Sequence, residues 1–73
     1  MKKFVLVDCW GRWWIDDRGR ENIDCTVQGY IKVAEANDRA ELKAPLRTEY
    51  RKDGTWHSFH IEKRAAAKAM GLV

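Results

Sequence analysis

The sequence contains little cysteine, a single proline and no long apolar run. Its two cysteines, Cys9 and Cys25, are too few for the disulfide framework of a small secreted domain, and they lack the close spacing of a zinc site. The apolar run at residues 4–7 ends at Asp8, too early for a signal peptide or a membrane span. We therefore expect a cytoplasmic protein without a metal, a cofactor or a membrane partner.

Catalytic signatures are also absent, because the sequence has no nucleophile elbow, P-loop, dinucleotide-binding fingerprint or paired-carboxylate cleft. Its 73 residues leave room for one domain, residues 1–73, with a core too thin to surround a deep pocket. The formal net charge of +3 suits a phosphate-bearing partner or an acidic protein surface. These properties favour a non-catalytic binding module over an enzyme.

Residues 4–15 and 23–33 alternate between apolar and other side chains with the period of two that predicts strands. The expected core face of the first strand carries its odd-numbered residues, which are Val5, Val7, Cys9, Gly11, Trp13 and Ile15. Gly11 is the expected position of a bulge. The polar loop at residues 16–22 should join the two strands in a long hairpin, with both cysteines as buried, reduced thiols.

The second half predicts a shorter hairpin. Residues 38–44 fit both a helical turn that ends before Pro45 and a strand, and we favour the helical turn. The pair Asp53-Gly54 predicts a two-residue type I′ turn. That turn would place Tyr50 opposite His57, and Arg51 opposite Trp56 as a cation–π pair.

Residues 62–70 have a helix-forming composition, and Gly71 is suited to end the helix. A narrow stripe of small and apolar residues would dock it on the sheet, namely Ala65, Ala66, Ala69 and Met70. The predicted fold is therefore α+β: a small antiparallel sheet of about four strands, arranged as two hairpins, with a C-terminal helix packed on one face.

If the outer faces of the two hairpins align, basic and aromatic side chains gather on one surface. The candidate binding residues are Trp10, Arg12, Trp14, Tyr30, Lys32, Arg47, Arg51, Trp56 and His60. Aromatic rings stack on unpaired bases, and Arg and Lys neutralise phosphates, so this surface predicts a partner that is a nucleic acid or a nucleoprotein complex. The alternative is that the helix covers this face and makes Trp10, Trp14 and Trp56 a second core layer.

Two other functions stay open. The same residue types suit a protein partner or a homodimer, and the small size and Trp-rich hairpins resemble phage-encoded regulators, including anti-CRISPR proteins, which occupy a host surface. A small metal-independent ribonuclease toxin would instead use His57 or His60, with Glu49 and with Arg47 or Arg51. A regulator or inhibitor that binds nucleic acid is the hypothesis we favour.

Overall fold

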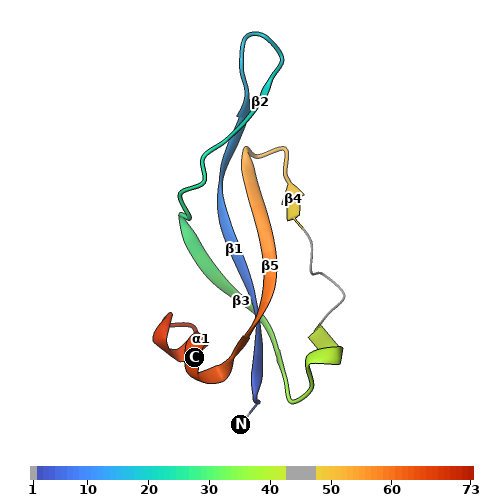
Figure 1. The fold of residues 1–73 in the computed structure, drawn as a ribbon, viewed down its shortest axis with the longest axis vertical. Coiled ribbons are helices and arrows are strands. Elements are labelled where there is room, and N and C mark those ends of the chain that lie inside the picture. The colour runs from blue at the N-terminus through green and yellow to red at the C-terminus, as the bar shows by residue number, and fades with distance from the viewer. Residues whose placement is uncertain (1, 43–47) are drawn as a thin grey trace.

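The computed structural model describes residues 2–42 and 48–73 (Figure 1). In this part of the chain the strands of one antiparallel sheet are β1 (Phe4–Ile15), β2 (Glu21–Ile23), β3 (Gly29–Ala36), β4 (Thr48–Tyr50) and β5 (Thr55–Lys63). A 3₁₀ turn, η1 (Arg39–Leu42), follows β3, and the helix α1 (Arg64–Ala69) follows β5 directly. The expectation of a mostly antiparallel sheet with a short C-terminal helix is thereby confirmed.

The long strand β1 is the centre of the sheet. One side of it pairs with β5 over residues 4–12, while its other side pairs first with β3 and then, at its far end, with β2. The short strand β4 adds to the outer edge of β5. The molecule is therefore elongated, 49 × 23 × 15 Å, with α1 at one end and the β1–β2 loop at the other (Figure 1).

The apolar run at the start of β1 is buried on both faces. Val5 and Val7 are 0 % exposed and pack with Ala67 of α1 on one face, which we call the helix face. Leu6 packs with Leu42 of η1 on the opposite face. A single core face along β1 was therefore a wrong expectation, because a run with apolar residues at every position suits burial between two layers.

The other end of β1 lacks this cover, so Ile15 is 59 % exposed although it was expected in the core. The second predicted strand is also interrupted, since residues 24–28 leave the ladder and the register against β1 shifts between Leu6 and Val7. Cys25 lies in this interruption and is exposed, which corrects the expected pair of buried thiols. Cys9 is half-buried, and burial together with the nearby Asp8 carboxylate raises the pKa of its thiol.

Gly11 forms no bulge against β5, because the pairing continues unbroken through residues 10–12. The absence of a side chain at Gly11 instead leaves room for a neighbouring indole ring. The indole of Trp56 lies across it so closely that an added Cβ would come within 2.6 Å of the ring.

The turn between β4 and β5 lies where it was expected but contains one more residue. Arg51 accepts a hydrogen bond from the Gly54 amide and donates one from its own amide to the Thr55 carbonyl, which makes a three-residue loop with Gly54 at φ +84°. Tyr50 therefore faces Trp56 and not His57, and Glu49 faces His57. The predicted cation–π pair of Arg51 with Trp56 depended on the wrong register.

The expected helical turn after β3 is confirmed over Arg39–Leu42, while residues 43 and 44 lie outside the described part.

The C-terminal helix begins two residues later than predicted, because Glu62 and Lys63 continue β5. Its fully buried side chain is Ala67, which the expected stripe did not include, while Met70 of that stripe packs against the core. Its end is as predicted, with Gly71 at φ +78° and the Leu72 amide donating to the Ala67 carbonyl.

Candidate nucleic-acid interface

Three of the predicted binding residues lie side by side on β1, facing away from the helix face. Trp10, Arg12 and Trp14 occupy alternate positions of one strand, so they share one side of the sheet, which we call the tryptophan face. A rise of about 3.4 Å per residue puts the first and last of them about 14 Å apart along the strand. Arg51 belongs to this face too, because it pairs with Thr55, which faces Arg12.

The remaining predicted residues do not join them. Residues directly opposite one another in an antiparallel pair share a face. Trp56 faces Gly11 and His60 faces Val7, so both lie on the helix face. Tyr30 and Lys32 face Cys9 and Val7, so the helix face carries them as well. The expected single surface is thus divided between two faces, and Arg47 lies outside the described residues.

The helix does not cover the tryptophans, which removes the alternative of a second core layer under α1. The helix packs on Val5 and Val7, at the opposite end of the sheet from β2, with which Trp14 pairs (Figure 1). Trp14 is 51 % exposed, whereas Trp10 and Trp56 are half-buried.

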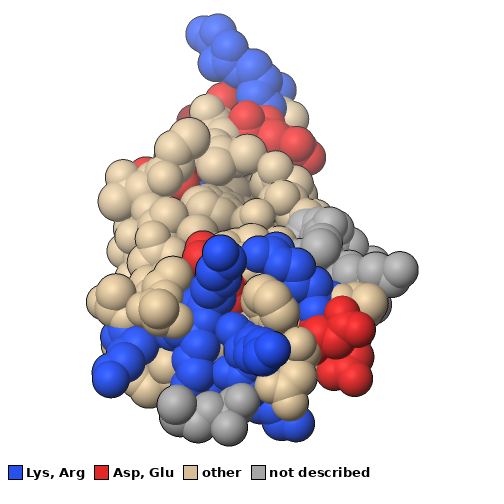
Figure 2. Space-filling model, turned by 60° about the horizontal axis from the view of Figure 1, so that its bottom comes forward, with Lys and Arg blue, Asp and Glu red and all other residues tan. Residues whose placement is uncertain are grey.

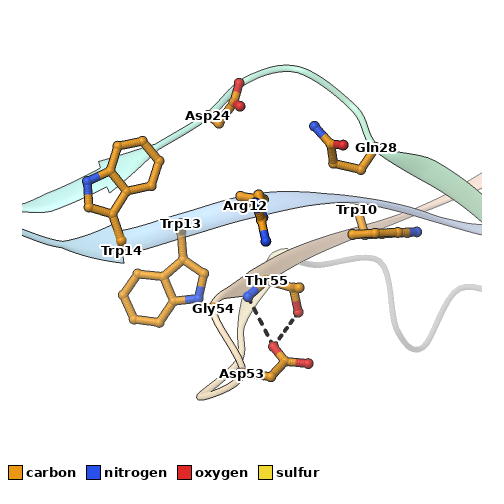
Figure 3. A pocket seen from close by; sticks show the side chains of 9 residues that line it. All are labelled: Trp10, Arg12, Trp13, Trp14, Asp24, Gln28, Asp53, Gly54 and Thr55. Carbon is orange, nitrogen blue, oxygen red and sulfur yellow. Dashed lines mark hydrogen bonds between the residues drawn. The ribbon is translucent and has the colours of Figure 1, made fainter.

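A pocket of about 660 Å³ opens on the tryptophan face (Figure 3). Its lining residues are Trp10, Arg12, Trp13, Trp14, Asp24, Gln28, Asp53, Gly54 and Thr55. Figure 3 shows Arg12 between Trp10 and Trp14 along β1, with Asp24 and Gln28 on one side and the β4–β5 turn on the other. The wall is therefore made of indole rings, one guanidinium group and two carboxylates.

Trp13 fixes the β4–β5 turn against β1. Its indole Nε1 donates to the carbonyl of Arg51 at 2.8 Å, and its backbone amide donates to the carbonyl of Gly54 at 3.0 Å. Its ring also meets Tyr50 edge to face, with centroids 5.6 Å apart. These contacts hold the turn that supplies one side of the pocket.

A chain of hydrogen-bonded side chains runs from the core to the pocket. The buried Asp8 carboxylate lies 2.7 Å from His57 Nδ1, and His57 Nε2 lies 2.9 Å from the hydroxyl of Thr55. That hydroxyl donates to Asp53 at the pocket wall. The imidazole also lies beside the ring of Trp10, with centroids 6.5 Å apart.

Each ring nitrogen of His57 has a hydrogen-bond partner. Nδ1 lies against the carboxylate of Asp8, and Nε2 lies against the hydroxyl of Thr55. The bond that this hydroxyl donates to Asp53, followed by the Thr55 amide and the charges of His57 and Arg51, lowers the pKa of Asp53.

Arg12 is the cation of the pocket that is free to meet a ligand. Its side chain makes no ion pair or hydrogen bond with the residues that the structure describes. Arg51, by contrast, is 3.3 Å from the carboxylate of Glu49. The pocket thus offers one unpaired guanidinium group beside Trp rings, and the carboxylate of Asp24 as an acceptor.

On the helix face the predicted residues are mostly engaged elsewhere. Trp56 Nε1 donates to the carbonyl of Asp24 at 2.9 Å, and His60 lies 3.0 Å from Glu62. Lys32 lies 3.5 Å from Glu35. His57 and His60 occupy opposite faces, so they form no common site.

The sequence interpretation missed the roles of Asp8, Thr55 and Trp13. The alternating pattern does place Asp8 beside Trp10 on one side of β1, but its pairing with His57, 49 positions away, depends on strand register.

Comparison of the chain with protein-family models, curated proteins and solved structures finds no match. Over residues 2–42 and 48–73, no helix is long and apolar enough to cross a membrane, and no group of three His, Cys, Asp or Glu could hold a metal ion.

Proposed function

We propose that the protein is a non-catalytic module, a regulator or inhibitor, that binds single-stranded nucleic acid or a nucleoprotein complex through the tryptophan face. The observation that supports this function is the row of Trp10, Arg12 and Trp14 beside an open pocket, where Arg12 has no ion-pair partner among residues 2–42 and 48–73. Stacking of a base on an aromatic side chain contributes about 1–3 kcal/mol and tolerates any sequence. Arg12 would meet a phosphate between two stacked bases.

The acidic residues of the pocket limit the electrostatic part of this binding. Asp24 and Asp53 repel phosphates, but their oxygens and the amide of Gln28 are placed to accept or donate at base edges. Stacking should therefore contribute more than counterion release. We expect an affinity that depends only weakly on salt, in contrast to a purely basic surface.

The test is tryptophan emission during titration with a single-stranded oligonucleotide of mixed sequence, at low and raised salt. We expect quenching, and a loss of affinity of about 5- to 150-fold in Trp14→Ala, which corresponds to one lost stacking contact. Tyr30→Ala is the matched control, because Tyr30 is an equally exposed aromatic residue on the helix face. Absence of quenching at both salt concentrations would exclude the proposal.

A second candidate function is binding to a protein partner or to a second copy of the chain. It is favoured by exposed apolar side chains on the helix face, at the end of the sheet where β1 pairs with β2. The side chains of Ile15, Ile23 and Tyr50 are each about half exposed there, because α1 packs at the other end of the sheet and does not cover them. Light scattering after size exclusion tests the homodimer. A dimeric mass that becomes monomeric in Ile15→Asp would support self-association, and a monomeric mass at all concentrations would exclude it.

A further inference from the structure

Lysine side chains gather at the end of the molecule opposite the tryptophans. Figure 2 shows Lys and Arg concentrated on this end, below the middle of the molecule. The exposed lysines are Lys2, Lys3, Lys63 and Lys68, which we call the lysine cluster. They come from both ends of the chain, so no single stretch of the sequence reveals them.

The cluster is assembled by the last strand pair and by the start of the helix. Phe4 faces Lys63 at the end of the β1–β5 ladder, and the amide of Arg64 donates to the carbonyl of Lys3 at 2.9 Å. A shallow hollow of about 480 Å³ lies between the lysines at positions 2, 3 and 63 and the start of α1. A second hollow, of about 400 Å³, lies beside Lys68 on α1 itself. The N-terminal segment and α1 are thereby held together as one surface.

Two nearby carboxylates, those of Glu35 and Glu62, are already paired with other groups. Glu35 receives a hydrogen bond from Arg64 at 2.6 Å and lies 3.5 Å from Lys32, and these partners lower its pKa. Glu62 lies 3.0 Å from His60. No ion pair joins the four lysines of the cluster to a residue in the described ranges. The four lysines therefore form a group of positive charges that no ion pair within the described ranges neutralises.

The chemistry of the cluster suits the phosphates of a nucleic-acid backbone. Ammonium groups are compact point charges that follow a row of phosphates without reading bases. The four tryptophans lie at Trp10, Trp13, Trp14 and Trp56, in the other half of the sheet, so this end has no indole on which a base could stack. A double helix, with one charge per about 1.7 Å and its bases already stacked, is therefore the better partner than a single strand.

A membrane surface fits less well. Insertion between lipids needs exposed apolar side chains beside the basic ones. Phe4 lies under the guanidinium of Arg39, at 4.9 Å, and Met70 and Leu72 pack on the core. Among the described residues near the cluster, Val73 is left as an exposed large apolar side chain.

We propose that the lysine cluster binds the phosphate backbone of double-stranded nucleic acid without sequence preference, as a second site separate from the tryptophan face. The proposal goes beyond the proposed function, and it holds or fails independently of base stacking. The protein would then contact a duplex at one end and unpaired bases at the other.

The experiment is fluorescence anisotropy of a labelled DNA duplex of mixed sequence at several salt concentrations. Four phosphate contacts predict a slope of log K against log salt of about −3.6, which is a loss of affinity of about 150-fold between 50 and 200 mM salt. In the double variant Lys63→Gln, Lys68→Gln two contacts remain, and the loss over the same range should fall to about 12-fold.

The matched control is Arg18→Gln, Lys52→Gln, which removes two exposed cations from the turns at the other end. Equal slopes for the two double variants would overturn the proposal. Binding to phosphatidylserine vesicles without binding to the duplex would overturn it too. Unchanged tryptophan emission on adding the duplex is expected, so a failure of the stacking site and a failure of the lysine cluster give different results.

Discussion

At the scale of single residues, Asp8 and His57 are the buried polar side chains of the part of the chain that the structure describes. Removing polar groups from water is costly unless they are hydrogen-bonded. Here His57 has a partner at each ring nitrogen, whereas Asp8 Oδ1 has none among the described residues. The pair therefore specifies how β5 lies against β1 more than it adds net stability.

Removing one member of this pair should be far more harmful than removing an exposed pair. Asp8→Ala leaves the buried Nδ1 of His57 without its hydrogen-bond partner, and we expect it to lower the free energy of unfolding by about 2–3 kcal/mol. Glu62→Ala is the control, because the pair of Glu62 with His60 is about one-third exposed and should contribute less than about 1 kcal/mol. Urea unfolding at pH 7 measures both. Similar losses for the two variants would show that the buried pair has no special role.

A second prediction at this scale concerns the close approach of Trp56 to Gly11. In Gly11→Ala the new Cβ would lie 2.6 Å from the indole, so the ring must move and its hydrogen bond to the Asp24 carbonyl must lengthen. Overpacking of this kind costs about 1–3 kcal/mol. Urea unfolding should show that loss, together with a red shift of the tryptophan emission. An unchanged midpoint would mean that the ring does not depend on the glycine.

At the scale of elements, the β4–β5 turn depends on Asp53. Its carboxylate accepts hydrogen bonds from the amide and the hydroxyl of Thr55, and these bonds hold the loop in shape while Asp53 is ionised. Because these bonds lower the pKa of Asp53 in the folded protein, the unfolded chain binds a proton more readily than the folded chain. The stabilisation is therefore complete above the ordinary pKa of about 3.8 and is lost as the pH falls further.

Asp53→Asn should remove this part of the pH dependence. We expect the melting temperature of the parent to fall more steeply than that of the variant between pH 5 and the acid limit, where the two should converge. The same measurement on Asp17→Asn provides the control, since Asp17 is an exposed carboxylate of the other turn whose side chain makes no hydrogen bond with the described residues. Parallel pH profiles for parent and Asp53→Asn would contradict the assigned role.

The same turn shows what a sequence can and cannot predict here. Asp53-Gly54 identifies the position of the turn, but an Asp-Gly pair fits both a two-residue loop and a three-residue loop with a bulge at the glycine. One extra residue moves each side chain of β4 to the other face of the sheet. This is why Tyr50 faces Trp56 and why Arg51 lies on the other face from Trp56. The rest of the predicted binding surface was divided by the register of β3 and β5 against β1.

Features that depend on one strand or one helix end were predictable. Trp10, Arg12 and Trp14 share a face because they alternate within β1, and Gly71 ends the helix because it accepts a positive φ. The pairing of Asp8 with His57 was not predictable, since it needs the register between strands far apart in sequence. The lysine cluster was missed for the same reason.

At the scale of the whole molecule, packing and candidate binding surfaces occupy different ends. The two core clusters lie at the start of β1, between α1 and η1, whereas the tryptophan face lies beyond them. Burial of apolar area is the main stabilising term of a small domain, so stability should be concentrated at the helix end. The tip of the long hairpin is held by its backbone hydrogen bonds and by those of the Asp16 carboxylate, which are largely exposed to water.

This separation predicts uneven hydrogen exchange along a single strand. The amides of Val5 and Val7 lie in β1 where it is paired on both sides and covered by α1, and they should exchange only on global unfolding. The amides of Trp13 and Asp24 are hydrogen-bonded at 3.0 and 2.9 Å, but they should exchange at least about a hundredfold faster through local opening of the tip. Exchange measured by NMR at neutral pH distinguishes these amides. If the tip amides exchanged as slowly as the core amides, the predicted separation would be wrong unless a second copy covered the tip. Repeating the measurement in dilute protein tests this, because protection by a second copy would be lost on dilution.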